Sequence, residues 1–246
     1  VVYIRLISKL IKKDGIYEVD GFLSEDDVMK IALEVESKQG RSSNLSGYCD
    51  IRHIGNDVKN AESFKIIKIK ELFDVMRRIS EEDNLYKVME SDNLMVTRLL
   101  IGRDGNKESN SFHYDSFYLT ALIGIKTPSN ESASGGLIVV NKLRGNAIGP
   151  RMSFLQKVII QNRISKKIIS LLVRNKLIKS RTIILSPGKL LVFFGARTLH
   201  ASDIYPDGNR ITLLLHTGLP NNKYKKMSGS GFKLKLKNKI ASYQNK

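Results

Sequence analysis

The fold is decided by the stretch His113-Tyr114-Asp115, which precedes the apolar run Leu119-Thr120-Ala121-Leu122-Ile123. The apolar run predicts a buried strand. In an extended chain, side chains two positions apart point to the same side, so the imidazole and the carboxylate converge. A second histidine, His200, follows another apolar run at 189–194. Two imidazoles and one carboxylate form a set that binds a metal on one face and leaves other positions open. We therefore expect His113, Asp115 and His200 to be metal ligands.

A basic residue and a hydroxyl follow the second histidine at a short interval. Arg210 lies ten positions after His200, and Thr212 lies two positions after Arg210, within an apolar run that ends at His216. On a strand, Arg210 and Thr212 face the same way. A guanidinium and a hydroxyl on one face can hold a carboxylate by charge-assisted hydrogen bonds.

This ordered set resembles the Fe(II)/2-oxoglutarate-dependent dioxygenases, in particular the branch around the prolyl hydroxylases. The resemblance covers roughly residues 92–218, including the runs Gly135–Val139, Ser186–Phe194 and Arg210–His216. It implies a mainly β fold with flanking α-helices. The expected core is a double-stranded β-helix, a jelly-roll or cupin-like arrangement, with a helical insertion.

The resemblance also implies the chemistry. Fe(II) is the expected metal, with 2-oxoglutarate and O2 as co-substrates and with succinate and CO2 released. Arg210 and Thr212 are the expected contacts of the far carboxylate of 2-oxoglutarate. Because family members that halogenate lack the carboxylate at the position of Asp115, we expect hydroxylation, with desaturation or ring closure left open. The tyrosine usual before the first ligand is replaced near Ile101, which weakens the case for a prolyl substrate.

Other residues near the motifs are weaker candidates. Tyr114, Phe117 and Tyr118 are candidates for lining a substrate pocket because they adjoin the first two ligands. Thr120 and Arg98 are interpreted mainly as strand packing, with contact to the co-substrate as the alternative. We interpret His216 as structural and place His53 in a loop that could cover the site.

Periodicity and turn signals predict the elements. Strands are expected at 16–22, 92–102, 118–126, 136–141, 181–185, 189–194, 198–202 and 210–218. Ser24 followed by acidic residues predicts a helix that ends near Ser37. A second amphipathic helix is expected at 63–80, and 39–62 is expected to be loop.

We expect one domain across residues 1–246. It comprises N-terminal elements at 14–91, the core at 92–218 with an insertion at 142–180, and a basic tail at 219–246. The insertion shows helical spacing over 153–173, with a basic face that either is solvated or binds a partner. Apolar positions 4, 7 and 11 predict an N-terminal helix that packs on the barrel, with a membrane-surface helix as the alternative.

The single Cys49 excludes an internal disulfide and a cysteine-based zinc site. A reducing compartment is expected, so we predict a cytoplasmic protein, with peripheral attachment to a membrane as an open alternative.

Charge is unevenly distributed along the chain. Residues 1–131 carry net −3 and residues 132–246 carry net +20, which together make the net +17 of the chain. This asymmetry indicates an anionic substrate, an anionic membrane or nucleic acid, although a compositional bias towards lysine is an equal alternative. An acidic or phosphorylated sugar, or a lipid-linked glycan, is the favoured substrate class. A nucleic-acid or protein side-chain hydroxylase and a non-catalytic jelly-roll binding module are the alternatives.

Overall fold

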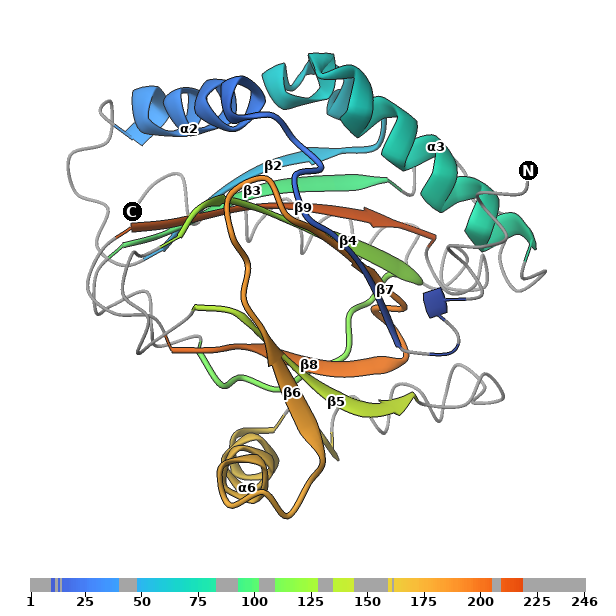
Figure 1. Cartoon of the computed structure of the whole chain (residues 1–246), viewed down its shortest axis with the longest axis vertical. Helices are drawn as coiled ribbons and strands as arrows, with labels where there is room; N and C mark the ends of the chain where they lie inside the picture. The colour runs from blue at the N-terminus through green and yellow to red at the C-terminus, as the bar shows by residue number, and fades with distance from the viewer. Residues whose placement is uncertain are drawn as a thin grey trace, which may run out of the picture.

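Two antiparallel sheets face each other in the computed structural model (Figure 1). The structure describes residues 10–11, 13, 15–39, 48–82, 93–101, 109–127, 135–143, 159–160, 162–204 and 209–218. The six-stranded sheet has the order β1-β7-β4-β9-β3-β2, and the three-stranded sheet has the order β6-β5-β8. The strands are β1 (Ile16–Val19), β2 (Tyr48–Ile54), β3 (Leu94–Ile101), β4 (Leu119–Lys126), β5 (Leu137–Leu143), β6 (Ser180–Ile183), β7 (Leu190–Phe193), β8 (Thr198–Ser202) and β9 (Asn209–Thr217). This is the expected double-stranded β-helix.

Side chains along each strand of the six-stranded sheet point alternately to its two faces, so the sheet has two different sets of neighbours. On β9, Ile211, Leu213 and Leu215 belong to the core cluster shared with the helices. Leu214 packs into a second cluster between the two sheets, where it meets residues such as Leu122 and Leu191. Because side chains alternate along a strand, Arg210, Thr212 and His216 share the face of Leu214. We call this face, which looks towards the three-stranded sheet, the inner face.

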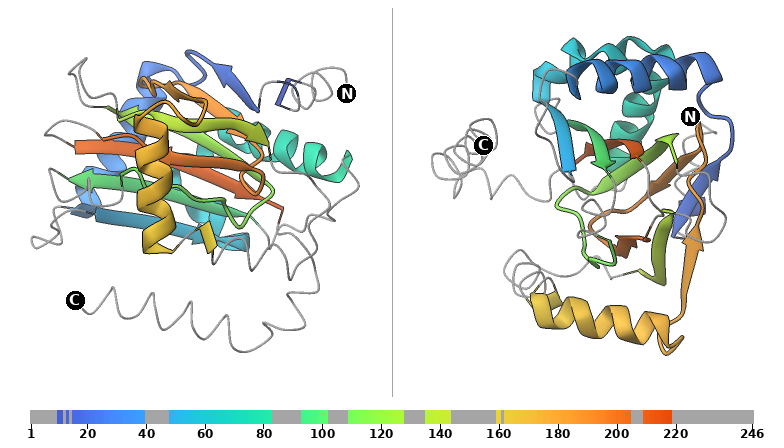
Figure 2. Two further views of the ribbon diagram at one scale, coloured as in Figure 1. Left: turned by 90° about the horizontal axis from the view of Figure 1, so that it is seen from below. Right: turned by 90° about the vertical axis from the view of Figure 1, so that its left-hand side faces the viewer.

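Helices α2 (Glu25–Gln39) and α3 (Ile67–Glu82) cover the other face of the six-stranded sheet (Figures 1 and 2). The backbone N–H of Asp27 donates to Ser24 Oγ at 3.2 Å, and three acidic residues occupy the first turn of α2. Both features stabilise a helix start. Buried residues of both helices, including Ile31, Ile69 and Met76, pack against the sheet.

Helix α6 (Arg163–Arg174) lies on the far side of the three-stranded sheet, within the expected insertion (Figure 2). Asn162 caps its start, because Asn162 Oδ1 accepts from the backbone N–H of Ser165 at 2.8 Å. Ile169 and Val173 pack against a cluster formed by Phe112, Ile138, Val140, Leu199 and Ala201. The expected helix began earlier, at 153, but residues 151–158 lie outside the described ones.

The expectation of loop over residues 39–62 was wrong in its second half. Residues 48–54 form the edge strand β2, which pairs with β3 from Tyr48↔Leu100 to Ile54↔Leu94, and Gly55–Asn60 and Glu62–Lys65 form short 3-10 helices. The polar residues of β2 misled the prediction. These polar residues are compatible with a strand because Asp50, the acidic one among them, has hydrogen-bond partners: it accepts from Arg98 and Arg52.

At the N-terminus, Ile11 is fully buried in the cluster below the helices, as expected for a segment that packs on the barrel. Positions 4 and 7 and the basic tail 219–246 lie outside the described residues. In the part of the chain that is described, no helix is both long and apolar enough to span a bilayer.

Candidate metal centre

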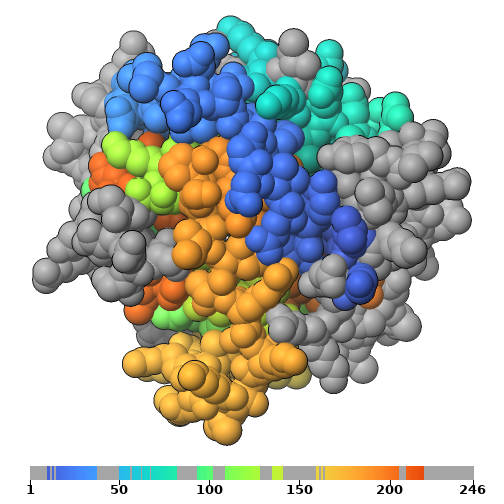
Figure 3. Space-filling view, viewed as in Figure 1, coloured from blue at the N-terminus to red at the C-terminus, as the bar shows by residue number. Residues whose placement is uncertain are grey.

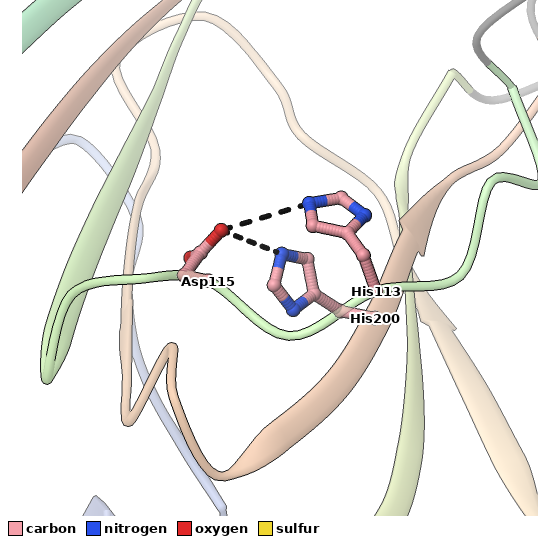
Figure 4. A group of neighbouring side chains, drawn as sticks. All are labelled: His113, Asp115 and His200. Carbon is pink, nitrogen blue, oxygen red and sulfur yellow. Dashed lines mark ion pairs between the residues drawn. The ribbon is translucent and has the colours of Figure 1, made fainter. Parts of the chain in front are cut away.

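Three predicted ligand residues meet between the sheets (Figure 4). The Nε2 atoms of His113 and His200 each lie 3.6 Å from Asp115 Oδ1, and one potential ligand atom from each residue falls within a 4.8 Å span. His200 and Asp115 are largely buried, whereas the side chain of His113 is 38% exposed. The cluster is therefore approached from the side of His113.

Backbone pairing brings the two histidines together. The N–H of His113 donates to the carbonyl of His200 at 2.9 Å, and the N–H of His200 donates to the carbonyl of His113 at 3.1 Å. This reciprocal bridge sets the rings side by side, with centroids 4.5 Å apart. Two positions further, the N–H of Asp115 donates to the carbonyl of Gly195 at 2.9 Å.

Each histidine is oriented through its second ring nitrogen. Nδ1 of His113 lies 2.7 Å from the carbonyl oxygen of Ser111, and Nδ1 of His200 lies 2.9 Å from that of Thr198. A carbonyl only accepts hydrogen bonds, so both Nδ1 atoms carry the proton. In the neutral rings, the Nε2 lone pairs then point at Asp115, as in metal-binding histidines. Lone pairs that face a carboxylate repel it unless a cation lies between them, so this donor set fits a divalent metal.

Electrostatics favour the protonation states that a metal needs at Asp115 and His200, whereas they favour the protonated ring at His113. Burial lowers the pKa of His200 to about 4, against the opposing charge of Asp115. Burial raises the pKa of Asp115, but His200 and His113 outweigh it and hold that pKa well below the usual range. Burial also opposes protonation of His113, yet the hydrogen bond to Asp115 and the charge of Asp115 raise its pKa. Around neutral pH, Asp115 is therefore anionic and His200 is neutral.

A second set of residues holds the carboxylate of Asp115. Thr120 Oγ1 donates to Asp115 Oδ2 at 2.5 Å, and Thr120 Oγ1 lies 3.0 Å from His216 Nδ1. Since the hydroxyl proton goes to the carboxylate, the oxygen of Thr120 accepts from Nδ1–H of His216. Phe117 stacks on His216, with ring centroids 5.0 Å apart. This chain leaves Oδ1 of Asp115 directed at the histidines.

The sequence alone does not reveal this role of Thr120 or His216. It indicates strand packing for Thr120 and a structural role for His216, and it does not link the two residues. The signal was present, because each is a polar residue inside an apolar strand. Only the β4–β9 register, which pairs Thr120 with His216, shows that they meet.

Gly195 makes room for the carboxylate. A Cβ at this position would meet Thr120 Oγ1, and it would lie 2.6 Å from Asp115 Oδ2 and 2.9 Å from Asp115 Cβ. Any side chain here would displace the carboxylate or the hydroxyl that orients it. The residue had no distinctive signal in the sequence.

The predicted co-substrate contacts lie on the inner face of β9. Arg210 and Thr212 are 2% and 3% exposed, four or more positions before His216 on the same strand. Thr212 lies opposite Arg98 in the β3–β9 ladder, so Arg98 shares this face. Arg98 Nε and Nη2 donate to Asp50 at 3.0 and 3.2 Å. The charge of Arg98 contributes to lowering the pKa of His216, which is lowered mainly by burial.

The three aromatic residues expected to line a substrate pocket lie in three different parts of the structure. Phe117 lies beside the candidate metal centre, where it stacks on His216. Tyr118 is 1% exposed and packs against Phe194 in the cluster on the helix side of the main sheet. Tyr114 packs against the cluster under α6. His53 lies on β2 and not in a loop, with Nδ1 at 3.1 Å from Asp57.

Comparison with known proteins identifies the fold. No protein-family model and no curated protein sequence matches the chain. Among solved structures, a Pseudomonas putida prolyl-4-hydroxylase matches with a TM-score of 0.54 at 13% identity, covering 89% of this chain and 100% of that one. A Trichoplax adhaerens prolyl hydroxylase, in complex with a peptide fragment of hypoxia inducible factor, matches with a TM-score of 0.53 at 13% identity, covering 89% and 90%.

A third structure extends the comparison beyond the prolyl hydroxylases. The non-heme alpha ketoglutarate dependent epimerase SnoN from nogalamycin biosynthesis matches with a TM-score of 0.54 at 12% identity. That match covers 88% of this chain and 81% of the epimerase. The chain therefore has the double-stranded β-helix fold of the 2-oxoglutarate oxygenases.

Proposed function

We propose that this chain is an Fe(II)- and 2-oxoglutarate-dependent oxygenase that hydroxylates its substrate and releases succinate and CO2. The observation that carries the proposal is the cluster of His113, Asp115 and His200, with both Nδ1 atoms bonded to carbonyls and both Nε2 atoms directed at one carboxylate oxygen. The fold supports the proposal, because SnoN has also been solved in complex with Fe3+ and alpha ketoglutarate.

In this proposal, the chain's own residues divide the work. His113, Asp115 and His200 hold Fe(II), which with 2-oxoglutarate and O2 supplies oxidation of a substrate C–H bond. Thr120 donates to the second oxygen of Asp115, which would leave one carboxylate oxygen to hold a metal. Arg210 and Thr212 bind the far carboxylate of 2-oxoglutarate, since a buried guanidinium is a permanent, fork-shaped partner for a carboxylate. Phe117 borders the substrate space beside His216.

We also propose that the substrate carries a negative charge, as an acidic or phosphorylated sugar or a lipid-linked glycan does. Arg98 and Arg52 both donate to the carboxylate of Asp50, which brings two guanidinium groups together on neighbouring strands. The side chains of Arg98 and Arg52 are 31% and 43% exposed, which leaves both within reach of a ligand. A protein side chain is the second candidate, because one similar structure was solved with a peptide.

The proposal is tested by anaerobic titration of Fe(II) in the presence of 2-oxoglutarate. We expect a weak metal-to-ligand charge-transfer band in the visible for the wild type and none for His200→Ala. His53→Ala is the matched control, because His53 lies on β2 and bonds to Asp57 outside the cluster. A folded wild type without the band, or a band that survives in His200→Ala, would contradict the iron–oxoglutarate site.

Substrate class is tested next, by following succinate release in air. Phosphorylated sugars, acidic glycans, peptides and single-stranded nucleic acids are compared at equal concentration. Stimulation by an anionic glycan that Arg98→Gln weakens through KM supports the charged substrate. Stimulation by a neutral peptide alone assigns a protein side chain instead.

A further inference from the structure

Helix α6 exposes a ridge of large apolar side chains. Ile164, Ile168 and Leu171 are 72%, 52% and 59% exposed, and Leu177, just beyond the helix, is 72% exposed. Residues spaced by four and three positions lie on one face of a helix. The ridge is not the side on which α6 packs, because Ile169 and Val173 already bury that side against the cluster on the three-stranded sheet.

The ridge lies at one end of the molecule. Figure 2 shows α6 crossing the outside of the three-stranded sheet, away from α2 and α3, and Figure 3 shows it protruding from this face. Contiguous apolar surface on a protruding helix indicates an interaction site more often than a scatter of single residues does.

Basic side chains flank the ridge. Lys167 and Arg174 are exposed on α6, and Lys176 and Lys179 follow it, also exposed. In the sequence from 132 to the end of the chain, Asp203 and Asp207 are the only acidic residues. Four exposed basic side chains on α6 and on the segment that follows it therefore accompany the ridge, and a fitting partner supplies both an apolar layer and negative charge.

We propose that α6 docks the protein on an anionic membrane surface. Ile164, Ile168 and Leu171 would enter the boundary between headgroups and acyl chains, while Lys167 and Arg174 meet anionic headgroups. Nucleic acid offers the charge but no apolar layer. A second copy that packs ridge against ridge would bring like charges together. The surface of a bilayer with anionic lipids supplies both requirements.

The docking helix is linked to the metal cluster. Lys166 Nζ donates to Ser111 Oγ at 2.7 Å, and the carbonyl of the same Ser111 accepts from Nδ1 of His113. Membrane docking through α6 therefore holds the segment that carries the first ligand close to the surface. The docking proposal does not rest on the proposed oxygenase activity, because lipid binding requires no metal.

The experiment is co-sedimentation of the full chain with phosphatidylcholine vesicles that contain or lack phosphatidylglycerol. We expect binding only to the anionic vesicles, and weakening of that binding as salt is added. Replacing Lys167 and Arg174 by Gln should reduce partitioning by about fivefold for each side chain, which corresponds to about 1 kcal/mol for each basic residue near an anionic leaflet. Ile168→Ser with Leu171→Ser should reduce it about tenfold or more, because apolar burial is lost.

Helix α2 offers a matched control. Met29 and Leu33 are 64% and 58% exposed at a spacing of four positions, but α2 is acidic and lies at the opposite end of the molecule (Figure 1). Met29→Ser with Leu33→Ser should leave vesicle binding unchanged. Absence of binding to anionic vesicles would overturn the proposal, and so would binding that the α6 variants do not weaken. A dimer in solution that the α6 variants dissociate would instead assign the ridge to contact between copies.

Discussion

Gly195→Ala tests how tightly the carboxylate of Asp115, a proposed metal ligand, is confined. The added methyl would lie 2.6 Å from Asp115 Oδ2, whereas ordinary contact begins at 3.4 Å, so the carboxylate has to retreat by the difference of 0.8 Å. Metal–ligand distances tolerate only about 0.2 Å. A displacement of this size would take the carboxylate of Asp115 out of bonding distance of a metal held by the two histidines. We expect the affinity for Fe(II) to fall about 100-fold, at the upper end of what changes beside a metal ligand cause.

Isothermal calorimetry with Fe(II) under anaerobic conditions measures the affinity, and thermal unfolding without metal measures the cost of overpacking. Overpacking costs about 1–3 kcal/mol. Gly188→Ala is the matched control, because its Cβ would lie 2.7 Å from the carbonyl oxygen of Leu23, in contact with the segment that precedes α2. Gly188→Ala should destabilise the fold and leave metal affinity unchanged. Equal Fe(II) affinity of the wild type and a folded Gly195→Ala variant would refute the reasoning.

Three further predictions concern the same centre. Thr120→Val should lower Fe(II) affinity about 10–100-fold because Asp115 loses its hydrogen bond, while Thr120→Ser should keep the affinity of the wild type. Calorimetry measures these affinities, and equal values for the wild type and both variants would contradict the role of the hydroxyl. Arg210→Met should weaken binding of 2-oxoglutarate roughly 100-fold and leave Fe(II) affinity unchanged, because charge-assisted hydrogen bonds are lost. If the variant binds 2-oxoglutarate as tightly as the wild type, Arg210 does not contact this co-substrate. Folding lowers the pKa of His200 from 6.5 to about 4, so in the metal-free protein the unfolded chain takes up this proton first as the pH falls. The stability of the wild type relative to His200→Gln should therefore decline from about pH 6.5 to about pH 4 and then level off, as followed by urea unfolding; a constant difference across that range would exclude a buried neutral His200.

Several strands could be predicted because their information is local. The run 198–202 matches β8 in both bounds, and 118–126 matches β4 within one residue, since apolar residues between turn signals indicate a buried strand. The meeting of the three side chains was also predictable, because His113, Asp115 and His200 stand in order beside apolar runs that become strands. Their arrangement in one cluster confirms that they meet.

The remaining features depend on contacts between distant segments. Strand β2 is polar and becomes a strand because Asp50 finds Arg98 on β3, which no local pattern reveals. Thr120 and His216 lie 96 positions apart, and their hydrogen bond follows only from the β4–β9 register. Gly195 matters because of the volume that Asp115 and Thr120 occupy opposite it. Register and volume are three-dimensional properties, so composition and periodicity do not contain them.

The reciprocal backbone bridge between His113 and His200 has a consequence for the time course of folding. The bridge closes a loop between two positions that are 87 residues apart, so the loop-closure entropy has to be overcome before the cluster exists. Long-range pairings of this kind tend to form late. Iron that binds only the completed bridge would leave the rate of folding almost unchanged and would slow unfolding, so its benefit would be a longer lifetime of the native state.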